Sequence, residues 1–76
     1  MPNELTIIFE RGDSGWWIAT IAEFPGAFSQ GRTKDEAREN VLDALTELMA
    51  ARRELALRDK GADAETETVP FGPSAR

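Results

Sequence analysis

The chain has 76 residues, which fits one small domain whose hydrophobic core alone gives only a few kcal/mol of net stability. It contains no cysteine and no histidine, which excludes disulfides, thiol nucleophiles, imidazole acid-base chemistry and the commonest zinc sites. Fourteen acidic and nine basic residues give a net charge of -5, so the composition favours a basic protein partner over nucleic acid.

The first third of the chain predicts a β-hairpin. Between residues 4 and 11, Leu5, Ile7 and Phe9 alternate with neighbours on the other face, which is the period of a strand. Residues 12–15 are turn formers, and residues 16–22 return to β-rich sequence. The two runs therefore predict antiparallel strands joined by a tight turn.

A third strand is predicted after a Pro-Gly turn. Phe24-Pro25-Gly26 is expected to break the second strand, because proline lacks a ladder donor and glycine permits the tight bend. Residues 27–30 then read as a short third strand.

A long amphipathic helix is predicted to begin at Lys34. Thr33 and Glu36 form a capping-box pattern, in which the hydroxyl accepts from the N3 amide and the carboxylate accepts from the cap amide. Apolar residues recur at three- and four-residue spacing, and nothing breaks the pattern before Gly61. About 26 residues of helix span roughly 39 Å, more than the roughly 30 Å diameter of a compact domain of this length. The last turns are therefore expected to overhang the sheet, fray or contact another subunit.

Residues 65–71 predict a fourth strand at a sheet edge, where Pro70 is tolerated. A right-handed crossover would place it parallel to the first strand, giving the order 3-2-1-4. The sequence thus predicts an α+β fold, β-β-β-α-β, with one long helix on one face. Residues 1–71 form one domain in this interpretation, and residues 72–76 have the composition of a disordered tail.

Both faces of the predicted sheet carry apolar residues, but the single helix can cover only one of them. Adjacent Trp16 and Trp17 must point to opposite faces of their strand, so one of them joins Ile8 on the uncovered face. This face is interpreted as an interface, with partial cover by loops and the C-terminal tail as the alternative. Stacking of single-stranded nucleic acid on the rings is disfavoured by the acidic charge. The candidate residues for a partner or self-association interface are Ile8, Trp16, Trp17, Phe28, Arg52 and Leu55.

Other classes of site are not predicted. A metal-dependent nuclease needs carboxylates that converge from neighbouring strands, whereas Glu4 and Glu10 lie at the ends of the first strand and Asp13 lies in a turn. Residues 51–60 carry a net charge of +2, which is interpreted as favourable charge at a helix C-terminus. No cofactor, metal or catalytic residue is expected. The N-terminus has no signal-peptide pattern and no run is long enough to span a membrane, so a cytoplasmic protein is expected.

Three segments resemble the HicB-like antitoxin domains in combination. They are Gly15-Trp16-Trp17-Ile18-Ala19, Phe24-Pro25-Gly26-Ala27-Phe28-Ser29-Gln30-Gly31 and Thr33-Lys34-Asp35-Glu36-Ala37-Arg38-Glu39-Asn40, within a resemblance that covers roughly residues 4–50. The resemblance implies a partial ribonuclease-H-like fold without the catalytic carboxylates of the nuclease.

For function, the resemblance implies a non-enzymatic antitoxin that self-associates and covers a small basic RNA-cleaving toxin of the HicA type. Family members often add a DNA-binding segment after this domain; the sequence leaves no room for one, so direct DNA binding is not expected. The alternative is an orphan oligomeric interaction domain with no toxin partner. A neighbouring reading frame for a small basic protein would separate the two.

Overall fold

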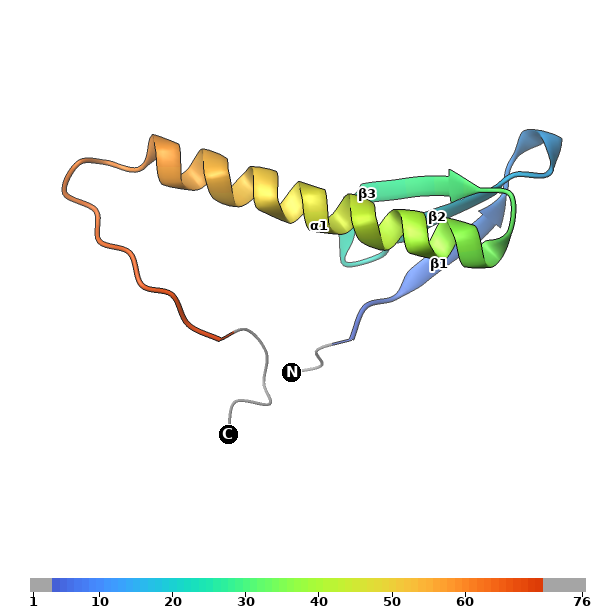
Figure 1. The fold of residues 1–76 in the computed structure, drawn as a ribbon, viewed down its shortest axis with the longest axis horizontal. Coiled ribbons are helices and arrows are strands. Elements are labelled where there is room, and N and C mark those ends of the chain that lie inside the picture. The colour runs from blue at the N-terminus through green and yellow to red at the C-terminus, as the bar shows by residue number, and fades with distance from the viewer. Residues whose placement is uncertain (1–3, 71–76) are drawn as a thin grey trace.

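The computed structural model describes residues 4–70 and has an α+β fold (Figure 1). Its elements are β1 (Ile7–Arg11), a 3-10 turn (Asp13–Gly15), β2 (Trp17–Ile21), β3 (Phe24–Gly31) and α1 (Lys34–Asp59). The strands form a three-stranded antiparallel sheet in the order β1-β2-β3, and the helix lies across one face. The predicted hairpin and the single long helix are confirmed.

The register of β1 and β2 fixes the two faces of the sheet. Ile7 lies opposite Ile21, and Phe9 lies opposite Ala19, so these residues share the face that α1 covers. The connection needs left-handed backbone, which Gly15 provides at φ 81°. Alternate residues of both strands therefore point away from the helix.

The third strand is longer than predicted, and the expected break at Pro25 is wrong. The chain turns at Ala22 and Glu23, and Pro25 lies inside β3. Ile21 is opposite Phe24 and Thr20 is opposite Phe28, so residues 25–27 form a bulge. A bulge on an edge strand tolerates proline because no ladder hydrogen bond is lost there.

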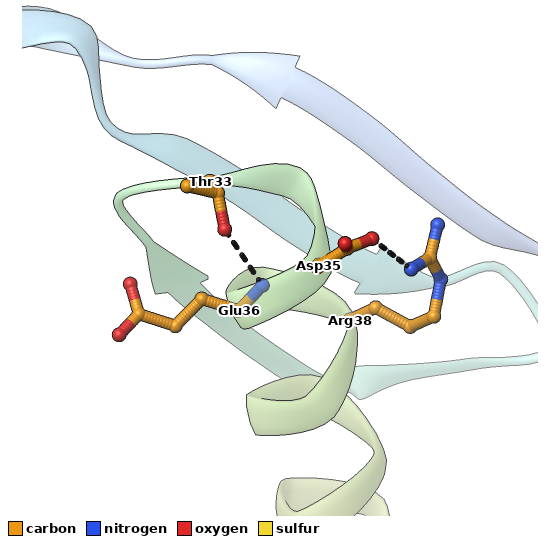
Figure 2. A network of polar contacts seen from close by, with 4 residues as sticks. All are labelled: Thr33, Asp35, Glu36 and Arg38. Carbon is orange, nitrogen blue, oxygen red and sulfur yellow. Dashed lines mark hydrogen bonds and ion pairs between the residues drawn. The ribbon is translucent and has the colours of Figure 1, made fainter.

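The start of α1 is capped as the sequence predicts (Figure 2). Thr33 has extended backbone, and its Oγ1 accepts from the N–H of Glu36 at 3.0 Å. The Glu36 carboxylate was expected to accept from the N–H of Thr33. It instead accepts from the N–H of Arg32, one residue earlier, at 2.6 Å. An ion pair of 2.6 Å joins Asp35 and Arg38 on the same turn.

Thr33→Ala is expected to lower the free energy of unfolding by about 0.5–2 kcal/mol, since the N–H of Glu36 loses its acceptor. Urea denaturation followed by circular dichroism measures the change. Thr46→Ala is a matched control on the same helix, because the Thr46 hydroxyl donates to the Leu42 carbonyl and caps nothing. An equal loss in both variants would contradict a specific capping role.

The hydrophobic core is small and lies between α1 and the sheet. The buried apolar residues are Ala19, Ile21, Ala27, Ala37, Val41 and Leu45. The helix packs mainly on β3 and β2, and it reaches β1 through Lys34 and Arg38, which lie over the Phe9 ring. Ile7 and Phe9 of β1 are consequently only half-buried.

The C-terminal half of α1 extends beyond the sheet (Figure 1). Every residue from Met49 to Asp59 is exposed, including Leu55 and Leu57 at 47% and 37%. The described chain measures 52 × 31 × 15 Å, with a radius of gyration of 15.9 Å. A compact domain of this length would have a radius of gyration near roughly 11 Å. The predicted overhang is therefore present.

The predicted fourth strand is not found among the described residues. Glu65 to Pro70 form no strand and are exposed, so the order 3-2-1-4 is reduced to 3-2-1; Phe71 lies outside residues 4–70. The overhang explains the error, because the chain leaves α1 well beyond the end of the sheet. β-Forming residues without an adjacent strand do not pair.

The beginning of β1 is tied to the β2–β3 turn by a carboxylate. The N–H of Thr6 donates to Oε1 of Glu23 at 2.8 Å, and this bond holds the pKa of Glu23 below its ordinary value of 4.5. A lowered folded-state pKa gives stability that is present above 4.5 and is lost as the pH falls through the folded-state pKa.

Glu23→Gln is therefore expected to lower the denaturation midpoint at pH 7, and the difference from the parent should shrink as the pH falls below 4.5. Thermal unfolding between pH 7 and pH 3 tests this. A difference that stays constant over that range would show that the Glu23 carboxylate does not contribute through its charge.

Candidate binding surface on the open face of the sheet

The sheet face that points away from α1 carries a row of side chains across all three strands. Ile8 of β1 lies opposite Thr20 of β2, which in turn lies opposite Phe28 of β3. Side chains directly opposite each other on one sheet face are in contact range. The row therefore joins two large apolar side chains through a threonine.

A neighbouring row continues this face. Ile18 lies between Glu10 and Gln30, and a shallow hollow beside it is lined by Ile18, Phe28, Ser29 and Gln30. Beyond this row, the Trp16 ring is half-buried with the guanidinium carbon of Arg32 5.1 Å from its centroid. The apolar residues Ile8, Trp16, Ile18 and Phe28 are called the open-face patch below.

Two members of the open-face patch are unusually exposed for their type. Phe28 is 65% exposed and Ile8 is 44% exposed. Large apolar side chains that adjoin on one face commonly mark sites of protein association. The patch is rimmed by Glu10, Gln30 and Arg32, which give it a polar border.

The two tryptophans have different environments. Trp17 lies on the helix side of the sheet, where its ring meets Phe9 edge-on at a centroid distance of 6.4 Å. The guanidinium of Arg11 and the ammonium of Lys34 lie 4.8 and 5.6 Å from the Trp17 centroid. Both rings are half-buried, but Trp17 packs against the core beneath the two cations, whereas Trp16 lies on the open face.

The structure separates the predicted interface residues into three places. Ile8, Trp16 and Phe28 belong to the open-face patch, whereas Trp17 belongs to the core. Arg52 and Leu55 are exposed on the overhanging part of α1 and are not brought to the open-face patch. Ile18 and Arg32 were missing from the prediction, although the two-residue spacing from Trp16 to Ile18 would have indicated Ile18.

Two other features are absent from residues 4–70. Within residues 4–70, no three acidic side chains gather closely enough to hold a metal ion. In that part of the chain, no helix has the length and apolar character needed to cross a membrane.

One curated protein gives a significant sequence match. UPF0150 protein Ta0767 from Thermoplasma acidophilum is 35% identical over 40 residues, which are 53% of this chain and 58% of that protein. This chain therefore spans only about half of the relative's length. UPF0150 is the HicB-like family, so the match is a distant family-level link. No family model matches the chain, and no solved structure matches it significantly.

Proposed function

We propose that this chain is a non-catalytic HicB-like binding module that self-associates and covers the RNA-binding surface of a small basic toxin. The open-face patch carries the proposal, because it offers exposed apolar anchors on an acidic domain. The distant link to a UPF0150 protein adds support. The finer assignment, a partial ribonuclease-H-like fold, belongs to the same proposal; residues 4–70 form three strands in the order 3-2-1 and one long helix.

The mechanism is occlusion in two stages. A net charge of -5 attracts a cationic surface over long range and speeds the encounter. Phe28 and Ile8, together with the exposed part of the Trp16 ring, then bury apolar area that water would otherwise contact, which sets the dissociation rate. A bound domain of this width would exclude RNA from the toxin without any chemical step.

The test is reconstitution with the product of an adjacent reading frame for a small basic protein. If that protein cleaves RNA, stoichiometric amounts of this chain are expected to stop cleavage. Phe28→Ala should weaken binding by about 2 kcal/mol or more, as for a central interface aromatic. Leu42→Ala is the control, since Leu42 is an exposed apolar residue of α1 outside both the open-face patch and the overhang. Unchanged cleavage at excess chain would refute the toxin assignment.

Salt should act mainly on the association rate. Screening over roughly 8–10 Å weakens attraction between the -5 chain and a cationic partner before contact, whereas apolar anchors are little affected. Stopped-flow binding between 50 and 500 mM salt measures both rate constants, with the range chosen to bracket roughly physiological ionic strength. A salt effect confined to dissociation would contradict electrostatic steering.

The proposal assigns no catalysis to this chain. Purified protein is expected to leave RNA intact with Mg²⁺ or Mn²⁺, because a two-metal mechanism needs converging carboxylates. Metal-dependent cleavage that co-elutes with the protein and disappears in Glu10→Ala or Asp13→Ala would overturn this part.

The second candidate is an orphan oligomeric interaction domain without a toxin. The exposed Met49, Leu55 and Leu57 on the overhang favour it, because self-association alone would cover them. Absence of any basic neighbouring reading frame, together with a stable oligomer by light scattering, would favour this alternative.

A further inference from the structure

The outer edge of β1 is an open template for another strand. Within residues 4–70, β1 pairs with β2 on one side and with nothing on the other. An unpaired edge presents a row of N–H and C=O groups that readily accept a strand. The opposite edge, β3, carries Pro25 and a bulge, which discourage strand addition. β1 has neither, so it is the receptive edge.

The same chain contains a segment with β-forming sequence and no partner. After α1, the N–H of Ala64 donates to the Gly61 carbonyl at 3.1 Å and turns the chain. Residues 65–69 then form no regular structure and are exposed, although Thr66, Thr68 and Val69 are β-branched. Residues 65–69 are called the C-terminal arm below.

The overhang of α1 carries this arm away from its own sheet. Residues 49–59 extend roughly 16 Å past the last helical residue that packs on the sheet. Figure 1 shows the chain after α1 turning back toward the start of the described chain without reaching the sheet. The ten residues from 61 to 70 span at most about 33–36 Å, so a return to the chain's own β1 would use roughly half of them.

We propose that the C-terminal arm of one copy pairs with the outer edge of β1 in a second copy, and that the exchange is reciprocal. If the sheet of the second copy lies beside the overhang, the whole arm can pair with its β1. No residues of the arm are then used to return to the chain's own sheet. Two-fold symmetry closes such an exchange as a dimer with two identical contacts. The overhang then lies against the partner, which covers Leu55 and Met49.

The charge of the overhang favours this placement, whereas the arm itself carries two acids, Glu65 and Glu67, and β1 is neutral overall. Residues 51–60 carry +2, and residues 1–31, which include all of β1, carry -3. Reciprocal exchange brings the positive overhang of each copy beside the negative hairpin of the other. The inference rests on the self-association in the proposed function and specifies its contacts; it does not depend on the toxin.

Cross-linking between differently tagged chains tests the exchange directly. The chain has no cysteine, so single cysteines can be introduced at will. Glu10→Cys on one tagged chain and Thr68→Cys on the other, joined by a short bis-maleimide, are expected to give a product containing one chain of each tag. Glu39→Cys with Thr68→Cys is the control, because Glu39 is exposed on α1 away from β1.

Proline at neighbouring arm positions gives a second readout. In a paired edge strand, alternate N–H groups face the partner, so only one of Glu67→Pro and Thr68→Pro should abolish the dimer in light scattering. The helical circular-dichroism signal should stay unchanged in both, because residues 67 and 68 lie outside α1.

The outcomes separate this inference from the broader proposal. A monomer of 8.4 kDa at micromolar concentration would refute self-association and the exchange together. A dimer that gives no mixed product, gives as much with the Glu39→Cys control, or cross-links only within a chain carrying both cysteines would refute the exchange alone. A dimer unaffected by either proline variant would also refute it.

Discussion

Replacement of Trp17 by alanine is expected to lower the free energy of unfolding by about 2–3 kcal/mol, less than the roughly 3–5 kcal/mol for a fully buried ring because Trp17 is half-buried, yet a large share of the stability of a domain this small. The Trp17 ring packs on the core cluster, meets Phe9 edge-on and is covered by Arg11 and Lys34. Its removal leaves a cavity that a single helix over three strands has few side chains to fill. Urea denaturation measures the loss.

Trp16→Ala is the matched variant, since it deletes the same ring one residue away on the other face. It should change the unfolding midpoint little and weaken self-association or partner binding by about 2 kcal/mol or more. Arg32 loses its cation-π contact in this variant. Equal effects of both substitutions on folding, with unchanged oligomer mass and affinity, would show that the open-face patch is not an interface.

Gly31→Ala is expected to destabilise the fold by about 1–3 kcal/mol or more, through overpacking rather than loss of contact. A Cβ at Gly31 would lie 2.6 Å from the Ala37 amide nitrogen and 2.9 Å from the Glu36 carbonyl carbon. Both are backbone atoms in the first turns of α1, so no side chain can swing away. The helix start has to move relative to β3, which disturbs the cap at Thr33.

Gly61→Ala is the control for the same substitution. A Cβ at Gly61 meets nothing within 4 Å, so this variant should be neutral or slightly more stable. Thermal unfolding of both variants provides the comparison. A Gly31→Ala protein as stable as Gly61→Ala would mean that the close approach of β3 to α1 is not maintained in solution.

The elements set by short-range chemistry were predictable from the sequence. The Thr33 and Glu36 pattern located the start of α1, because a cap is a local exchange between a side chain and nearby backbone N–H groups. The alternation in residues 4–11 and 16–22 likewise located the hairpin, with ends shifted by one to three residues. Helix length followed from the absence of a breaker before Gly61.

The errors came from features that depend on partners distant in the chain. Pro25 was read as a strand breaker, yet a bulge between Phe24 and Phe28 accommodates it. Residues 65–69 have β-forming side chains, but no strand of their own chain lies beside them in the structure. A β-strand requires an adjacent strand to pair with, and the local sequence pattern does not determine the position of that adjacent strand.

The sequence by itself determined that Trp16 and Trp17 point to opposite faces of the sheet and that α1 begins after Thr33. It also determined that α1 is longer than the diameter of a compact domain of this size. These follow from the two-residue period of strands and the rise of the helix. Only the tertiary structure decided that α1 covers the Trp17 side and leaves Ile8, Trp16 and Phe28 open. The reason is packing: Gly31 and Ala37 let the helix approach one face closely, and that contact depends on how β3 passes into α1.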